Sequence, residues 1–365
     1  MDTSDPSIIF DDLGVCDHCN TFRKQILPGW DKEQNTDKID ILSMKIKKAG
    51  RNKDFDCIIG LSGGIDSSYL AYIAVKKMGL RPLLFHVDAG WNSQQAVNNI
   101  EQITERLNLD LYTEVIDWEE MKDFQLAWFK SGLPHIDIPQ DHAFVATLYN
   151  FASKHNIKYI LNGGNISTEC VRNPMEFLYY GTDMTQIRDI IGRFSTREYK
   201  TYPFSSVLRH KFYLRWIRGI KVVRPLNYRP YLKSDALSLL EKEYGWKPYP
   251  QKHFESRFTK FYEGYWLPER FGFDTRRVQY SSLILTNQMT REEAINKISK
   301  PAYDESTITN DFEYIATKLD ISIDELLSLH KGPNKSWRDY KSRQGLIEIG
   351  TKAQRILGIQ RAIIR

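Results

Sequence analysis

The stretch that most constrains the fold is 61–68, a glycine turn with the sequence Leu-Ser-Gly-Gly-Ile-Asp-Ser-Ser. An apolar run at 55–60 precedes it, as expected for a buried parallel strand, and Leu70, Ile73 and Ala74 follow at helical spacing. Adjacent glycines let the backbone approach an anion closely, while serine hydroxyls and the first amides of the helix can donate to that anion. The stretch therefore predicts a phosphate-binding loop between a strand and a helix.

Two commoner phosphate loops do not fit this stretch. A Walker loop carries a lysine directly after its second glycine, and no Gly-Lys pair occurs in the sequence. The dinucleotide spacing Gly-x-Gly-x-x-Gly is absent as well. The alternative without function is a serine- and glycine-rich connector, but the strand-turn-helix context favours an anion site. On such a surface turn, we expect Ser62 and Asp66 to lie outside the core.

Four further apolar runs continue the alternation of strands and helices. They span 82–88, 111–116, 158–161 and 222–226, and helical patterns lie between the first of them. This alternation predicts an α/β fold with a parallel sheet and right-handed crossovers.

Polar residues are expected at one rim of this sheet, because ligands of α/β sheets bind beyond the carboxyl ends of the strands. Asp88 ends the second run, and the polar turn 162–170 follows the fourth, with Gly163 and Gly164 near its start. A plain turn is the alternative for 162–170. Its place on the same rim as the first loop favours a role in binding nucleotide or substrate.

Local patterns also predict helix boundaries. Asp141 is expected to open a helix that turns Val145 toward the sheet. Thr290 and Glu293 have the spacing of a capping box, and Thr309 is expected to cap a following helix.

The chain divides into three parts on these patterns. Residues 1–50 hold a Cys-x-x-Cys segment and a helix, 51–250 form the domain of the glycine loop, and 251–365 are mainly helical. Within the second part, an aromatic and arginine-rich insertion at about 165–220 breaks the alternation. Insertions of this length are usually functional.

Composition narrows the class of protein. The chain has 365 residues, of which 41% are hydrophobic, so it can bury a sizeable core. No apolar run approaches the roughly 20 residues needed to span a bilayer, and the start has no signal-peptide pattern, so we expect a cytoplasmic protein without membrane contact. Basic residues are concentrated in 165–225, with 11 Lys and Arg against 5 Asp and Glu, and in 333–365, with 8 against 2. This asymmetry suits an anionic substrate or nucleic acid, or else is ordinary solvated surface.

The four cysteines do not form a disulfide framework for a chain of this length, and reduced thiols are expected. Cys16 and Cys19 form one Cys-x-x-Cys pair after an apolar run at 8–10 that could pair as a strand. Structural zinc needs four ligands, and neither Cys57 nor Cys170 is spaced as a second pair. The pair is therefore half of a zinc site at most, or simply two free thiols.

The glycine loop resembles the Ser-Gly-Gly-x-Asp-Ser loop of the N-type ATP pyrophosphatases, the PP-loop superfamily. Together with it, six other stretches resemble one family within that superfamily, the N-acetyl sugar amidotransferases of surface-polysaccharide, O-antigen (lipopolysaccharide) and flagellin-glycan biosynthesis. These stretches are 1–6, 14–19, 140–143, 164–170, 255–260 and 288–294.

The resemblance implies a sheet of the adenine-nucleotide α-hydrolase (PP-loop ATPase) type and a reaction that uses ATP and Mg²⁺. ATP would adenylate the acetamido oxygen of a sugar, and ammonia would replace it to give an acetamidino group. Asp66 would orient the loop or contact the metal, Ser62 and Asp66 being the catalytic candidates, and Asp88 would face the nucleoside. The pyrophosphate would be held by the loop and the second turn through Ser62, Gly63, Gly64, Asp66, Ser67, Ser68, Gly163 and Gly164. The candidates on the sugar side are Thr168, Glu169 and Arg257.

The resemblance also implies partners: a separate glutaminase subunit and a cyclase-like barrel subunit that supply ammonia, with an anionic or nucleotide-linked N-acetyl sugar as substrate. Family members carry a further Cys-x-x-Cys just before the point at which this chain begins, so Cys16 and Cys19 would be a zinc half-site. Either the start lies upstream or no Zn²⁺ is bound.

Two alternatives remain from the sequence. One is a tRNA-modifying PP-loop enzyme, although no nucleic-acid-binding signature is present and Cys170 is the one thiol expected near the rim. The other is a non-catalytic nucleotide-binding subunit, which could retain a phosphate loop.

Overall fold

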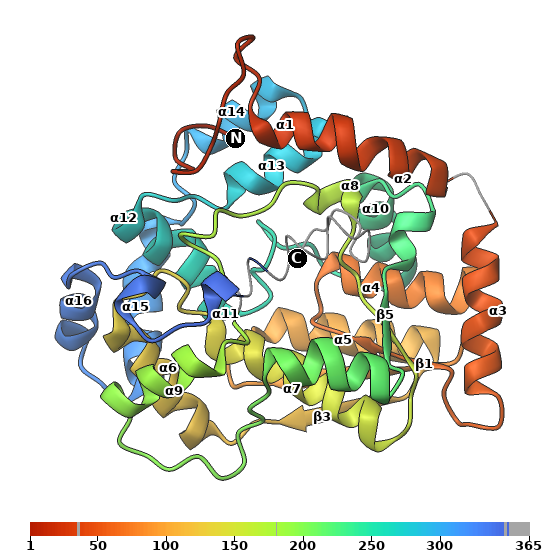
Figure 1. Ribbon diagram of the computed structural model, residues 1–365, viewed down its shortest axis with the longest axis horizontal. Helices are drawn as coiled ribbons and strands as arrows, with labels where there is room; N and C mark the ends of the chain where they lie inside the picture. Colours follow the sequence, from red (N-terminus) through yellow and green to blue (C-terminus); the bar gives the residue numbers. More distant parts are fainter. Residues whose placement is uncertain (35–36, 180, 347–348, 350–365) are drawn as a thin grey trace.

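The computed structural model describes residues 1–34, 37–179, 181–346 and 349 (Figure 1). A five-stranded sheet of order β3-β2-β1-β4-β5 lies at its centre, and all four strand pairs are parallel. The predicted α/β fold with a parallel sheet is thus confirmed. The strands are β1 (Cys57–Gly60), β2 (Pro82–Asp88), β3 (Leu111–Val115), β4 (Tyr159–Leu161) and β5 (Lys221–Val223).

Alternate residues of the strands contribute to two separate cores. In β1, Ile58 belongs to one cluster of buried side chains, whereas Cys57 and Ile59 belong to the other; Phe85 and Leu84 of β2 divide in the same way. Because successive side chains of a strand point to opposite faces, both faces of the sheet are covered, as is usual for a parallel sheet.

The core that contains Ile59 is completed by helices on one face of the sheet. Its helical members include Ile46, Leu70, Ile100 and Leu240. The helices that carry them are α3 (Lys38–Gly50), α4 (Ile65–Tyr72), which continues as the π-helix η2 (Ile73–Lys77), α5 (Gln94–Leu107) and α10 (Lys233–Tyr244).

The other face carries α6 (Trp118–Ser131) and α7 (Ile138–Lys154), whose side chains join the core of Ile58. Two expectations for α7 are wrong. The helix begins at Ile138, before Asp141, because Pro139 lies in its first turn, where a missing N–H is harmless. Val145 is 39% exposed and lines a cavity instead of packing on the sheet.

The segment between β4 and β5 contains α8 (Ile166–Glu169), α9 (Met184–Phe194) and the π-helix η3 (Arg209–Ile217). The buried Glu120 of α6 fixes it, since its carboxylate accepts hydrogen bonds from the backbone N–H groups of Lys200, Thr201 and Tyr202. The expected strand 222–226 is shorter, because Arg224 leaves the sheet and a 3₁₀ turn, η4 (Pro225–Tyr228), begins at the proline.

The C-terminal region is helical and packs into the same core as α6. Phe258 contacts the rings of Trp91 and Phe129, at centroid distances of 4.9 and 5.8 Å. The division of the chain at 50 and 250 stays a prediction, and 350–365, with its basic residues, lies outside the described part. The elements are α11 (Arg257–Phe261), η5 (Tyr262–Trp266), α12 (Leu267–Phe271), α13 (Arg276–Leu285), α14 (Arg291–Ile298), α15 (Glu305–Leu319), α16 (Ile323–Lys331) and η6 (Trp337–Asp339).

The N-terminal segment lies against α13, as Figure 1 shows for α1. The amino group of Met1 donates to Ser281 Oγ at 2.8 Å. The expected strand at 8–10 is wrong: Phe10 makes an isolated bridge to Cys16, and Ile9 is 69% exposed. The elements here are α1 (Asp17–Thr21), η1 (Phe22–Ile26) and α2 (Leu27–Gln34).

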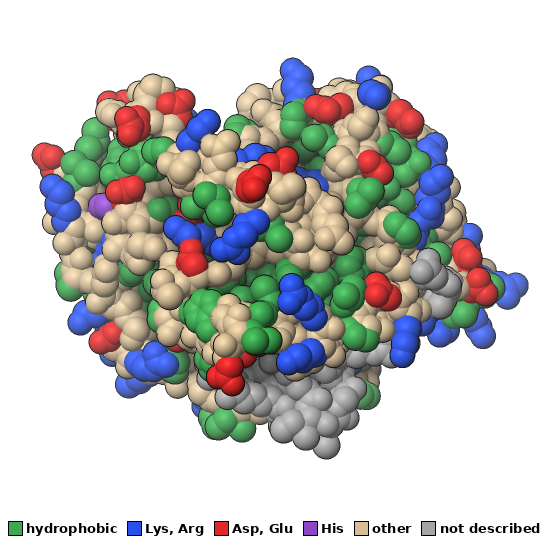
Figure 2. Space-filling model, turned by 90° about the horizontal axis from the view of Figure 1, so that it is seen from above, with side chains coloured by type: hydrophobic (Ala, Val, Ile, Leu, Met, Phe, Trp, Pro, Cys, Tyr) green, Lys and Arg blue, Asp and Glu red, His purple; other side chains and the backbone are tan. Residues whose placement is uncertain are grey.

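The surface gives little support to a single charged region. On the face shown in Figure 2, Lys and Arg side chains are interspersed with acidic and hydrophobic ones. No helix in the described part of the chain is long and apolar enough to cross a membrane. A cytoplasmic location stays a prediction.

Helix capping provides a first test. Thr290 and Glu293 form the expected capping box of α14, whereas Thr309 lies inside α15, which Asp304 caps. Thr290→Ala should lower the free energy of unfolding by about 1 kcal/mol. Thr309→Ala should raise it slightly, by at most about 0.7 kcal/mol, since alanine is the better helix former. Chemical denaturation of both variants measures this difference. If Thr309→Ala lowered the free energy of unfolding as much as Thr290→Ala, the conclusion that only Thr290 caps a helix would be contradicted.

Candidate active site

The glycine loop adopts the geometry of an anion cradle between β1 and α4. Gly63 has φ +82°, and a Cβ there would lie 2.8 Å from the carbonyl oxygen of Ala96, so only glycine fits. The backbone N–H of Gly64 donates to Ser62 Oγ at 3.2 Å. Ser68 Oγ is buried and has no hydrogen-bonding partner among the described residues. Because Ser68 is 0% exposed, its hydroxyl lies in the interior, and the donors that remain for a phosphate are the backbone amides at the N-terminus of α4 and the hydroxyls of Ser62 and Ser67.

Three side chains donate hydrogen bonds to the carbonyl oxygen of Gly63. The indole N–H of Trp246 donates to it at 2.9 Å, the Tyr249 hydroxyl at 3.3 Å and Asn99 Nδ2 at 3.4 Å. These donors fix the turn before any ligand binds. No sequence pattern predicted them, although an aromatic- and proline-rich segment at 244–254 was present as a signal.

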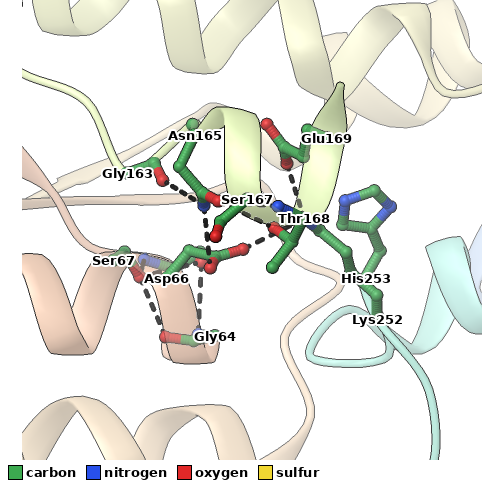
Figure 3. Close-up of polar contacts among 12 residues, drawn as sticks. Gly64, Asp66, Ser67, Gly163, Asn165, Ser167, Thr168, Glu169, Lys252 and His253 are labelled. Carbon is green, nitrogen blue, oxygen red and sulfur yellow. Dashed lines mark hydrogen bonds and ion pairs between the residues drawn. The ribbon is translucent and has the colours of Figure 1, made fainter. Parts of the chain in front are cut away.

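Asp66 points back into the protein and orients the loop. Its Oδ1 accepts hydrogen bonds from the Tyr231 hydroxyl at 2.6 Å and from Asn165 Nδ2 at 3.2 Å. Its Oδ2 lies 3.0 Å from Lys252 Nζ, and Figure 3 shows Asp66 with Asn165 and Lys252. The side chain is 16% exposed, so Asp66 is not one of the buried core residues, but it is less open to solvent than Ser62, which is exposed. Of the two roles suggested for Asp66, this geometry favours orientation of the loop.

Charge on Asp66 is stabilised by its neighbours. Burial alone would raise the pKa of its carboxyl, but the charge of Lys252 and the hydrogen bond from Tyr231 outweigh burial and lower that pKa. Burial would lower the pKa of Lys252, whereas Asp66 and Glu169 raise it. Both groups are therefore ionised at neutral pH.

Lys252 supplies the cation that the loop sequence lacks. It lies 186 residues from Asp66 along the chain, and its Nζ also lies 2.6 Å from Glu169 Oε1. Lys252 and Lys233 line a cavity of about 350 Å³ together with the glycine loop. We call this the phosphate cavity; among its other lining residues are Ser62, Gly64, Asp66, Ser67, Gly163, Gly164, Glu169, His253 and Glu255.

A second cavity of about 360 Å³ adjoins it at the carboxyl ends of β1 and β2. We call it the acidic cavity, because four Asp and Glu side chains and no lysine or arginine are among its described lining residues. Burial and the charge of Asp141 raise the pKa of Asp137 to about 8. The four acidic side chains are Asp137, Asp141, Glu255 and Glu263.

A third, smaller cavity of about 80 Å³ lies between α8 and α13. Thr168 and Glu169, two candidates for the sugar side, line it, as do Lys252 and His253. We call it the acceptor cavity. Glu255 contacts the glycine loop: its Oε1 accepts a hydrogen bond from Ser62 Oγ at 3.2 Å.

Two candidates lie apart from these cavities in the described structure. Asp88 Oδ1 accepts from the backbone N–H of Gly90 at 2.8 Å. Arg257 Nε donates to Asp311 Oδ1 at 3.1 Å, and its guanidinium stacks 3.8 Å from the centroid of the Tyr314 ring. The roles of Asp88 at the nucleoside and of Arg257 at the sugar remain untested.

The described residues offer no preassembled metal site. No three His, Cys, Asp or Glu side chains within 1–34, 37–179, 181–346 and 349 come together as one. The sulfur atoms of Cys16 and Cys19 lie 3.4 Å apart, while His18 between them binds Asp5 Oδ2 through Nε2 at 2.8 Å. We therefore derive no chemical step through zinc, and the zinc half-site stays a prediction.

Family comparisons divide the chain between two models. Residues 35–171 match the NAD synthase model, and 255–354 match the model of the C-terminal domain of the LPS biosynthesis protein WbpG and its relatives. The GMP synthase [glutamine-hydrolyzing] of Thermosipho africanus is 30% identical over 146 residues, in an alignment that covers 36% of this chain and 26% of that protein. The chain thus spans about a quarter of that relative.

Two solved structures that match the chain share little of its sequence. The NH₃-dependent NAD synthetase of Campylobacter jejuni is 13% identical, with 84% of this chain and 98% of that chain covered and a TM-score of 0.33. The NMN synthetase of Francisella tularensis is 16% identical, with 70% and 95% covered and a TM-score of 0.35.

Proposed function

We propose that this chain, which belongs to the PP-loop ATP pyrophosphatases and carries a WbpG-like C-terminal domain, is an ATP-dependent amidotransferase acting on an N-acetylated sugar. It would convert the acetamido group into an acetamidino group for a surface glycan, such as lipopolysaccharide O-antigen or a flagellin glycan. The observation that carries the proposal is the contact of the two matched regions at one site. Glu255, the first residue of the WbpG-like match, binds Ser62 of the glycine loop.

The lining residues of the cavities support separate sites for the phosphates of ATP and for the sugar. The loop amides at the N-terminus of α4, with Lys233 and Lys252, would bind the phosphates of ATP. The sugar would enter beside Thr168 and Glu169, and the helices of the WbpG-like domain form the far wall of that acceptor cavity. The basic residues of 165–225, none of which lines the acidic cavity, would attract an anionic or nucleotide-linked sugar.

The chemistry is a displacement in two steps. The acetamido oxygen forms a bond to the α-phosphorus as the bond to pyrophosphate breaks. Ammonia then attacks the acetamido carbon and loses a proton, and AMP leaves with the former amide oxygen. Adenylation is needed because an amide oxygen is a poor leaving group. The relationship to ATP-utilising PP-loop proteins implies that ATP is used with Mg²⁺, which neutralises phosphate charge when bound.

The tRNA-thiolation alternative is disfavoured by the thiol near the rim. Burial raises the pKa of Cys170 to about 12, and its sulfur donates to the carbonyl oxygen of Ser282 at 3.7 Å. A thiol of this kind is a poor nucleophile. An assay distinguishes the proposed enzyme from a non-catalytic subunit, because such a subunit would bind ATP without releasing pyrophosphate.

Mass spectrometry of the sugar provides the test. The purified chain should release pyrophosphate from ATP with an N-acetylated sugar and ammonium, and the sugar should show the mass decrease that accompanies replacement of oxygen by NH. Pyrophosphate release that depends on tRNA instead of a sugar would overturn the proposal.

The source of nitrogen gives a further prediction. A glutaminase needs an activated nucleophile, and burial raises the pKa of both Cys57 and Cys170. We therefore expect the isolated chain to use free ammonium but not glutamine, and to gain glutamine-dependent turnover when the proposed glutaminase and cyclase-like barrel subunits are added. Assays with each nitrogen source check this, and glutamine-dependent turnover by the chain alone would contradict it.

A further inference from the structure

One side chain lies where the three cavities meet. His253 lines the phosphate cavity, the acidic cavity and the acceptor cavity, and no other described residue lines all three. It follows Lys252 on the same segment, as Figure 3 shows. Its backbone has φ +67°, in the left-handed region that few non-glycine residues adopt, although His, like Asn and Asp, adopts it more often than most. Such strain, held by the surrounding structure, is typical of functional positions.

The ring of His253 is held by a carboxylate from the WbpG-like domain. Its Nδ1 lies 3.0 Å from Glu263 Oε1 and 3.2 Å from Oε2, and Thr275 Oγ1 donates to Glu263 Oε2 at 3.2 Å. An ionised carboxylate only accepts hydrogen bonds, so Nδ1 carries a proton. No described residue bonds Nε2, and the side chain is 36% exposed. The pair thus presents Nε2 as the atom available to a ligand.

With the pyrophosphate in the phosphate cavity and the sugar in the acceptor cavity, the nucleoside is left to the acidic cavity, which adjoins the phosphate cavity at the carboxyl ends of β1 and β2. During adenylation, the α-phosphorus is joined to the nucleoside, to the departing pyrophosphate and to the incoming acetamido oxygen. A side chain that borders all three spaces therefore lies next to that phosphorus. On the premise of the proposed function, we propose that His253 is a catalytic residue that donates its Nε2–H to an oxygen of the α-phosphate.

The charge of the ring agrees with this role. Burial alone would lower the pKa of His253, but the charge and hydrogen bond of Glu263 outweigh it and raise that pKa to about 9. Other charged groups face the ring: Lys252 opposes protonation and Glu255 favours it. Asp137, Asp141 and Glu169 border the same cavities. At neutral pH the ring is an imidazolium, and it keeps its proton while the phosphorus–oxygen bond to pyrophosphate breaks and pyrophosphate takes the electron pair.

His253→Gly provides the main test, because glycine accepts the positive φ without strain. The substitution leaves Glu263 without its cation, so we expect a lower melting temperature in a protein that still folds, a decrease of about 10²–10³-fold in pyrophosphate release, and partial recovery on addition of imidazole. Asn52→Gly, at φ +64°, is the matched control, and neither the substitution nor imidazole should change its turnover. Wild-type turnover in His253→Gly would overturn the inference, as would an impaired, folded variant that imidazole does not restore.

The pH profile separates a catalytic role from a structural one. In the wild type, pyrophosphate release should fall as the pH rises through about 9, where His253 loses its proton. Glu263→Gln removes the carboxylate that raises this pKa, so the fall should move to lower pH by at least about one unit. If pyrophosphate release by a folded Glu263→Gln variant fell at the same high pH as in the wild type, the catalytic role of His253 would be contradicted.

A measurement without any acceptor keeps the two proposals distinguishable. Binding of α,β-methylene-ATP should raise the pKa of His253 measured by NMR, since the ring would face an α-phosphate oxygen. If no N-acetylated sugar is converted but this shift occurs, the proposed function fails and the position of His253 is supported. If the sugar is converted but the analogue leaves the His253 resonances unchanged, the position of His253 is refuted.

Discussion

Replacing Lys252 by methionine is expected to reduce ATP-dependent pyrophosphate release by about a hundredfold or more. Methionine preserves most of the length of the side chain but removes the charge that lies in the phosphate cavity between Asp66 and Glu169. No lysine follows the glycines of the loop, so we expect this cation from a distant segment to take the place of the Walker lysine. A steady-state assay of pyrophosphate measures the loss.

The same substitution should destabilise the fold. It leaves Asp66 largely buried without its cation, and removal of one partner from a buried ion pair typically costs about 3–5 kcal/mol. The double variant Lys252→Met with Asp66→Asn should recover most of that stability, because the introduced amide is neutral and its oxygen can still accept the hydrogen bond from Tyr231. It should not recover activity.

Comparison of the single and double variants distinguishes the two roles of Lys252. Unfolding curves and turnover are measured on both proteins. If the double variant regained turnover together with stability, Lys252 would act only through the fold, and its role at the phosphates would be wrong. If the single variant kept full stability, the ion pair with Asp66 would be unimportant.

Acid should weaken this network in the wild type. The pKa of Asp66 is lowered in the folded protein, so its contribution to stability is present above the ordinary aspartate pKa of about 3.9. It is lost as the pH falls from there through the lowered pKa.

The local structure around the loop was predictable from the sequence because it depends on neighbouring residues. The apolar run of β1, the glycines and the helical spacing from Leu70 all lie within one short stretch. The same holds for the capping box of Thr290 and Glu293. Each signal is local, and so is the structure it predicts.

Most of the site could not be predicted, because it depends on segments that meet only in the folded chain. Lys252, His253 and Glu255 stand in a segment without secondary-structure periodicity, and nothing local relates them to Ser62. Two wrong predictions have a similar cause, because local residue type did not show the surrounding structure. Thr309 is a residue type that often caps helices, but α15 already begins at the earlier cap Asp304. Val145 has the spacing of a core residue, but a cavity faces it.

The second large effect is expected for Gly63→Ala. Alanine at φ +82° is strained by about 1–2 kcal/mol, and its Cβ would lie 2.8 Å from the carbonyl oxygen of Ala96, which as backbone cannot move aside easily. Any shift of the turn also disturbs the carbonyl oxygen that Trp246, Tyr249 and Asn99 hold. We therefore expect a loss of at least about 2 kcal/mol in the free energy of unfolding and at least a tenfold loss in ATP affinity.

Gly192→Ala is the matched control, because Gly192 is exposed in α9 and nothing lies within 4 Å of a Cβ there. Alanine should stabilise this helix by up to about 1 kcal/mol without changing ATP binding. Denaturation and calorimetric titration with ATP check both variants. Since the two substitutions add the same methyl group, their difference reports the environment of the loop alone. If Gly63→Ala bound ATP as tightly as Gly192→Ala, the phosphates could not depend on the turn at Gly63, and the phosphate cavity would have to bind them through its lysines.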